Sequence, residues 1–268
     1  MAGRVSVPAP EPADPTSAMA DPAPAMADLP DPVAAARRFV EQRGFPGLRA
    51  AFVAGSVLTR HRTPTSDLDI VVLLAGPPAP FRENLRHDGW PVELFVQTEA
   101  DWHRFADQEL ADGRSPLLHM CAQGLLLADV DGLGATLQSL ARQRLAAGPP
   151  SATTAELDRR RYEITDALDD LRGAADLAER LYLATQLLHK ASELALRAEG
   201  RWLGGGKWLS RRLGAADPAL HHALTSAVTA VATDAPDGTQ RLVAAVEQAL
   251  SLAGGPLWAG YTLGRPDS

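Results

Sequence analysis

Two aspartates stand one residue apart at the start of the most hydrophobic segment of the chain, and a glutamate lies in a later apolar segment. Asp67 and Asp69 open DLDIVVLLA, and Glu93 lies within PVELFVQ. Alternate side chains of a strand share a face, so both aspartates are expected on one side of a strand with Cα atoms about 6.5–7 Å apart. If the second segment pairs beside the first, Glu93 reaches the same pocket.

Carboxylates this close repel one another unless a cation compensates them. Hard oxygen ligands suit Mg²⁺, so we predict that Asp67, Asp69 and Glu93 hold Mg²⁺, as a pair of ions. Such a site suits in-line displacement at phosphorus, in which one ion holds a triphosphate and the other lowers the pKa of an attacking hydroxyl. Glu93 is then expected to act as the proton acceptor, as a metal ligand or as both.

A Gly-Ser pair precedes the aspartates by ten residues. Gly55 lacks a Cβ, so its backbone can approach a phosphate closely. Ser56 offers a hydroxyl and a backbone N–H, and a helix that begins there would favour an anion. Ser66, directly before Asp67, is expected to cap the start of the strand. Gly-Ser alone or Asp-x-Asp alone is more often a turn or a solvated strand end. The two motifs in this order, each next to an apolar strand, are a much more specific signal.

The segment FVAGSVLTRHRTPTSDLDIVVLL resembles the motif of the nucleotidyltransferase superfamily whose palm domain is shared with DNA polymerase β. Four positions match the family's motif: Gly55, Ser56, Asp67 and Asp69. Glu93 corresponds to the family's third acid, on a neighbouring strand. The resemblance implies Mg²⁺, ATP or another NTP as co-substrate, and transfer of a nucleoside monophosphate with release of pyrophosphate.

The overall plan resembles the small stand-alone aminoglycoside and lincosamide nucleotidyltransferases and their bacterial relatives. That resemblance implies an α-helical domain after the catalytic one, with the NTP and a small-molecule acceptor in the cleft between them. Its Gly-x-Lys-Trp segment matches WLGGGKWLSRRL, which places Lys207 at the triphosphate, although a solvated lysine in a loop is the alternative. Arg60 and Arg62 either contact phosphates or only solubilise their loop. The predicted nucleotide-binding residues are Gly55, Ser56, Arg60, Ser66, Lys207 and Arg211.

Three further aspartates lie at helical spacing in the second half of the chain. Asp166, Asp169 and Asp170 stand at i, i+3 and i+4, which places them on one helix face. They are candidate ligands for a cationic substrate such as an aminoglycoside, and a solvated acidic face is the commoner explanation. Lys190 lies one residue from an apolar helical stripe and is expected to be a boundary residue.

The sequence predicts an α+β architecture with two domains. Residues 1–30 are punctuated by proline and are expected to be a disordered tail. Residues 31–148 are expected to form an α/β nucleotidyltransferase domain with a mixed sheet, 155–254 an antiparallel α-helical bundle, and 255–268 a C-terminal tail. The expected strands lie within 48–56, 67–75, 91–97 and 124–130, and the expected N-terminal helices are 32–43, 98–113, one starting at 116, and 133–147.

Composition limits the function classes. The chain has 268 residues, a formal charge of −7 and one cysteine, Cys121. The negative charge disfavours nucleic acid as the partner, and the single cysteine excludes an internal disulfide and makes a reducing cytosol the simplest setting. No apolar run has the length of a membrane helix, and the acidic N-terminus does not fit a signal peptide.

Three functions follow. The first is transfer of AMP, or another NMP, to a hydroxyl of a small molecule such as an aminoglycoside-like antibiotic. The second keeps the chemistry but modifies a protein or a tRNA end, as in toxin–antitoxin systems. The third is a catalytically silent nucleotide-binding module, which the presence of all three acids argues against.

Overall fold

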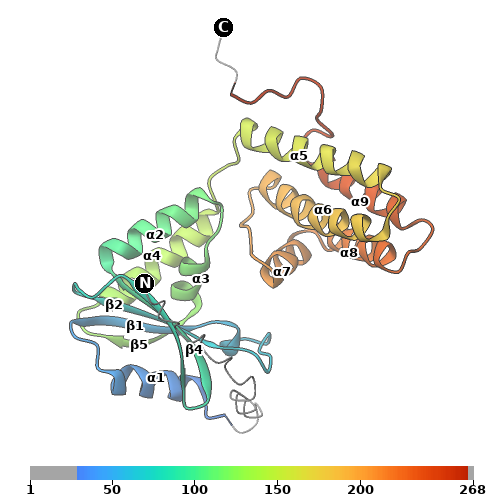
Figure 1. The fold of residues 1–268 in the computed structure, drawn as a ribbon. Helices are drawn as coiled ribbons and strands as arrows, with labels where there is room; N and C mark the ends of the chain where they lie inside the picture. Colours follow the sequence, from blue (N-terminus) through green and yellow to red (C-terminus); the bar gives the residue numbers. More distant parts are fainter. Residues whose placement is uncertain (1–28, 265–268) are drawn as a thin grey trace, which may run out of the picture.

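A computed structural model describes residues 29–264, in which a five-stranded mixed sheet has helices on both faces and a further group of helices follows (Figure 1). Residues 1–28 of the expected N-terminal tail lie outside the described part. The strands are β1 (Leu48–Ala54), β2 (Leu68–Leu74), β3 (Phe81–His87), β4 (Trp90–Thr98) and β5 (Leu125–Asp129).

The sheet order is β3-β4-β2-β1-β5. Strands β2 and β4 are parallel, and the other neighbouring pairs are antiparallel, so the sheet is mixed as expected. Four strands coincide with predicted segments. Strand β3 was not predicted, because FRENLRH contains five polar residues and no β-branched residue. It is an edge strand, where charged side chains are common.

Helices α1 to α4 cover the sheet. Figure 1 shows α1 (Pro32–Arg43) on one face and α2 (Glu99–Ala111), α3 (Pro116–Gln123) and α4 (Leu133–Ala147) on the other. Gly44, in a left-handed conformation, ends α1 at the predicted boundary of 32–43, and a capping box of Thr98 and Asp101 starts α2 at the predicted start of 98–113. Local capping therefore fixes where these helices begin and end.

The side chains of β2 alternate between two hydrophobic cores, one on each face of the sheet. Leu68, Ile70 and Val72 are buried in the core beneath α1. Val71 and Leu73 are buried in the core beneath α2, α3 and α4. Asp69 therefore shares the α2–α4 face, as the period of two requires.

The remaining helices pack around a third hydrophobic core. Leu187 and Leu194 of α6 and Leu209 and Leu213 of α7 contribute to it. The sequence EGRWLGGGKWLSRRLG (199–214) predicts an interruption of the helical pattern, but a helix begins within it at Lys207, directly after three glycines. The helices of this group are α5 (Thr154–Gly173), α6 (Leu177–Ala198), α7 (Lys207–Ala216), α8 (Pro218–Ala232) and α9 (Gly238–Ser251).

Specific hydrogen bonds join the α5–α9 helices to the first half of the chain. The backbone N–H of Leu203 donates to Gly113 O at 2.8 Å. The indole Nε1 of Trp202 donates to Leu145 O at 3.1 Å. Segment 201–206 is therefore anchored immediately before α7 begins.

Within residues 29–264, no helix has both the length and the apolar composition needed to cross a bilayer.

Candidate functional site

The parallel pairing of β2 and β4 brings the three acids together. Asp69 lies directly beside Glu93 in the register of the two strands, and Asp67 stands one residue before β2. One carboxylate oxygen from each of Asp67, Asp69 and Glu93 lies within 4.8 Å of the other two. The three carboxylates therefore lie close together, and their all-oxygen donor set fits a hard divalent cation such as Mg²⁺.

The carboxylate of Asp69 is partly buried and lies near a second negative charge. Burial, followed by the charge of Asp67, raises the pKa of Asp69 to about 6, while Arg82 and Lys207 act in the opposite direction. Desolvation and like charge both disfavour the ionised form. A divalent cation would compensate the charge, so this observation also fits a metal site.

Gly55 adopts a conformation that permits close approach to Asp69. Its φ is +99°, and a Cβ placed there would collide with the Oδ2 atom of Asp69. Strand β1 ends at Ala54, which pairs with Asp69, so the turn starts against the carboxylate. Glycine is required here for both the backbone angle and the space.

Gly55→Ala is expected to lower activity about 100-fold, equivalent to about 2.7 kcal/mol, and to destabilise the fold by about 1–3 kcal/mol through backbone strain. Steady-state kinetics and urea unfolding measure both effects. Gly76→Ala is the matched control, because a Cβ there meets nothing within 4 Å and φ is not positive. Equal behaviour of the two variants would contradict the role given to Gly55.

Ser56 and Ser66 hold the turn together from inside. Ser56 begins a three-residue 3-10 turn, and its hydroxyl lies 2.9 Å from the Ser66 hydroxyl. The Ser66 hydroxyl also accepts from the backbone N–H of Thr63 at 2.9 Å. Both serines are buried, with 5% and 3% of their surface exposed. Their hydroxyls therefore connect the Gly-Ser turn to the loop before β2.

Arg82 of β3 is a site residue that the sequence did not reveal. Its guanidinium forms an ion pair with Glu93 and stacks 4.8 Å above the ring centroid of Phe95. Asn84 lies opposite Glu93 in the same antiparallel pair. The alternation of Arg82, Asn84 and Arg86 along FRENLRH would indicate polar side chains on one face of a strand. It has this meaning only if the segment is first assigned as a strand.

The cations of α7 lie near the acids and the loop that precedes them. Lys207 is close enough to Asp69 to lower its pKa. Arg211 stacks 4.7 Å above the ring centroid of Trp208. Partial burial, then Arg211 and Arg60, lower the pKa of His61, which places Arg211 beside the 59–66 loop. The structure thus brings Lys207 near Asp69 of β2 and Arg211 near His61 in the loop before it.

Arg62 lies apart from the carboxylates. Its guanidinium stacks 4.9 Å from the ring centroid of Trp90, a residue of the core beneath α1. Arg60 is exposed at the tip of the same loop.

The acids of α5 are not brought to this pocket. Asp166, Asp169 and Asp170 are exposed, and Asp169 binds Arg172 at 2.7 Å. The C-terminal half of α5, yellow in Figure 1, lies away from the sheet. Lys190 forms an ion pair with Glu163 at 2.5 Å, so it lies on the surface between α5 and α6.

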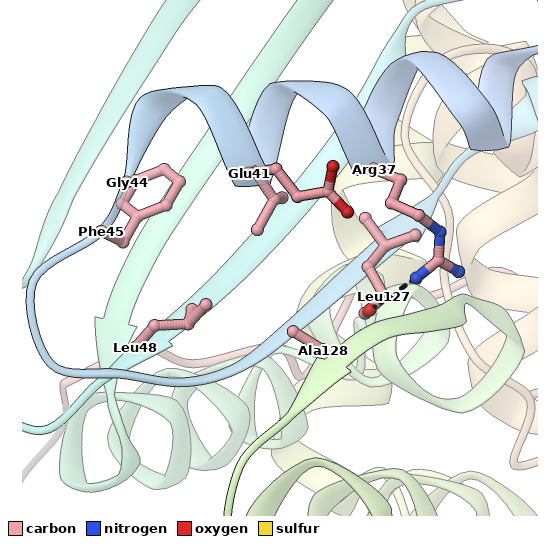
Figure 2. A pocket seen from close by; sticks show the side chains of 8 residues that line it. Arg37, Glu41, Gly44, Phe45, Leu48, Leu127 and Ala128 are labelled. Carbon is pink, nitrogen blue, oxygen red and sulfur yellow. Dashed lines mark hydrogen bonds between the residues drawn. The ribbon is translucent and has the colours of Figure 1, made fainter.

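A separate cavity of about 290 Å³ lies on the other side of the sheet, beneath α1 (Figure 2). Phe45, Leu48 and Leu127 supply much of its lining, and Arg37 donates from Nη1 to Leu127 O at 3.0 Å. Glu41 is its only carboxylate. The cavity contains no cluster that resembles the site formed by Asp67, Asp69 and Glu93.

No protein-family model and no curated protein sequence matches the chain. Among solved structures, it is similar to a nucleotidyltransferase-like protein from Exiguobacterium sibiricum 255-15, with 13% identity and a TM-score of 0.45, over 82% of this chain and 74% of that chain. A similarity at this level does not establish a family, so the functional argument rests on the residues of the site.

Proposed function

We propose that the protein is a Mg²⁺-dependent nucleotidyltransferase that moves a nucleoside monophosphate, with ATP as the expected donor, to a hydroxyl of a small molecule and releases pyrophosphate. The observation that carries the proposal is the cluster of Asp67, Asp69 and Glu93 on two parallel strands, with Gly55 packed against it and Lys207 facing it. The motif resemblance supports the same reaction class.

Each residue has a role that follows from its position. Asp67, Asp69 and Glu93 would hold Mg²⁺, which when bound neutralises triphosphate charge and acidifies the attacking hydroxyl. The glycine at position 55 leaves room for the Asp69 carboxylate against the turn that follows β1. Glu93 is the acceptor for the hydroxyl proton, and Arg82 keeps its carboxylate oriented across the β3–β4 pair.

Lys207 provides a sharp test, since the chain contains only two lysines. Lys207→Ala should raise the KM for Mg-ATP about 10-fold to 100-fold, because hydrogen bonds to charged groups contribute about 1.5–3 kcal/mol. Lys190→Ala is the matched control, because that lysine already pairs with Glu163. Steady-state kinetics over a range of ATP concentrations measures both. A similar KM for the two variants would remove Lys207 from the triphosphate site.

The reaction itself is tested by calorimetry and product analysis. Mg²⁺ with AMPCPP, whose α–β bridge resists cleavage, should bind wild-type protein, and Asp67→Ala should abolish this binding. Pyrophosphate release from Mg-ATP with a panel of aminoglycosides tests the antibiotic acceptor that the resemblance favours. Label from α-labelled NTP on protein or RNA would favour the second function, and binding without any transfer would favour the silent module.

A further inference from the structure

Helix α7 carries three cations and no acid. Lys207, Arg211 and Arg212 lie within its ten residues, KWLSRRLGAA. Across residues 29–264 none of the three forms an ion pair, whereas most arginines of α5 and α6 pair with a carboxylate. The charge of α7 is therefore not neutralised by an ion pair within the described part of the chain.

These cations point in two directions. Lys207 and Arg211 are four residues apart and share a helix face, toward Asp69 and His61. Arg212 is rotated by about 100° from Arg211. Its Nη2 lies 3.5 Å from Ser115 Oγ, at the start of α3. The second cationic face of α7 thus meets α3 instead of β2.

Among residues 29–264, no carboxylate forms an ion pair with Arg212. Ser115 is fully buried, and burial together with the charge of Arg212 lowers the pKa of His119 to about 4, so His119 is a neutral imidazole at pH 7. Arg114 adds a second positive charge near Arg212 and pairs with Glu193 at 3.0 Å. Glu109 of the preceding helix is engaged by the backbone N–H of Leu117.

Arg197 shows how this chain treats a buried guanidinium elsewhere. Only 4% of its side chain is exposed, and it donates to both carboxylate oxygens of Glu156 at 2.9 and 3.0 Å. Arg212 is half-buried with one long hydrogen bond to a serine. A partly desolvated cation without a partner is costly, and an anionic ligand would offset that cost.

Building on the proposed function, we propose that the acceptor is itself an anion: a hydroxyl compound whose phosphate or carboxylate binds Arg212 and Arg114 beside α3. Lys207 and Arg212 are offset by about 7.5 Å along the helix axis and by about 140° around it, so the triphosphate and the anionic group of the acceptor would bind on different faces of α7. A polycationic acceptor would meet like charge on both faces of α7.

The chemical step is the same nucleotidyl transfer as in the proposed function. The acceptor hydroxyl oxygen forms a bond to the α-phosphorus of the NTP as the bond from that phosphorus to the α–β bridging oxygen breaks. Pyrophosphate leaves with the electron pair, and the hydroxyl proton passes to Glu93. Arg212 and Arg114 take no part in bond making; they hold the anionic end of the acceptor.

The test is calorimetric titration of four probes into full-length protein saturated with Mg²⁺ and AMPCPP. Ribose 5-phosphate and gluconate carry hydroxyls with a phosphate or a carboxylate, ribose is neutral, and kanamycin is polycationic. We expect at least one anion to bind at least 10-fold more tightly than ribose and kanamycin, and the stronger of the two identifies the anionic group. Absence of anion binding, or equal binding of ribose or kanamycin, would overturn the proposal.

Variants locate the site. Arg212→Gln should weaken anion binding at least 10-fold, Arg212→Lys should weaken it less, and the exposed control Arg241→Gln should leave it unchanged. Binding of Mg²⁺ and AMPCPP should stay within twofold in all three. If Arg212→Gln weakens AMPCPP instead, Arg212 belongs to the nucleotide and the inference is wrong. If wild-type protein does not bind AMPCPP, the proposed function fails, and the inference fails with it.

Discussion

Asp69→Asn is expected to stabilise the ion-free protein at pH 8 while lowering turnover about 10³-fold, a loss of about 4 kcal/mol of transition-state stabilisation. Burial and Asp67 raise the pKa of Asp69 from 3.8 to about 6. The folded state therefore binds this proton more tightly than the unfolded chain. Its ionisation costs nothing below pH 3.8, costs progressively more up to about pH 6, and reaches a plateau of about 3 kcal/mol above it.

Urea unfolding in EDTA, at pH 8 and below pH 4, measures this effect. The gain of Asp69→Asn should be present at pH 8 and vanish at the lower pH. Asp101→Asn is the control of opposite sign, because hydrogen bonds from Arg104 and Thr98 lower the pKa of Asp101 and stabilise its charged form. An Asp69→Asn variant that is less stable than wild type at pH 8, or that keeps full turnover, would contradict the interpretation of the site.

Glu156→Gln is expected to destabilise the protein by about 3 kcal/mol, because it leaves the buried Arg197 guanidinium without a counter-ion. The hydrogen bond and charge of Arg197 lower the pKa of Glu156, so this stabilisation is complete above pH 4.5 and is lost as the pH falls through the folded-state value. Arg197 also donates to Pro150 O at 3.1 Å, which ties the 148–153 segment to α6.

Chemical denaturation at pH 7 measures the loss. Glu163→Gln is the matched control, because its partners Lys190 and Arg159 are more exposed and such surface pairs contribute about 0–1 kcal/mol. Equal stability of the two variants would show that the Glu156–Arg197 pair contributes no more than a surface pair.

The order of the elements was predictable where local chemistry determines it. Asp31 and Gly44 bound α1, and the Thr98 capping box starts α2, because caps depend on a few neighbouring residues. The period of two in DLDIVVLL placed Asp69 on the face opposite Leu68 and Ile70. The meeting of Asp67, Asp69 and Glu93 followed from this pattern once β2 and β4 paired.

What the sequence did not reveal depends on distant neighbours. Strand β3 has little β propensity and forms because β4 provides a pairing partner. The sequence alone therefore does not place Arg82 next to Glu93. Helix α7 was obscured by its three preceding glycines, and Arg212 gains meaning only because α3 lies beside it. The spacing of Asp166, Asp169 and Asp170 was helical as expected, but spacing does not reveal which face of α5 meets the rest of the chain.

The Leu203–Gly113 hydrogen bond anchors the segment directly before α7, and the proposed metal ligands come from the first half of the chain. The acids proposed for metal chemistry lie between residues 67 and 93, while Lys207 and Arg212, two of the cations proposed to bind the reactants, follow Leu203 on one ten-residue helix. Exchanging that helix would change which reactants bind while leaving the proposed metal ligands in place, which makes α7 the natural segment to vary in laboratory evolution.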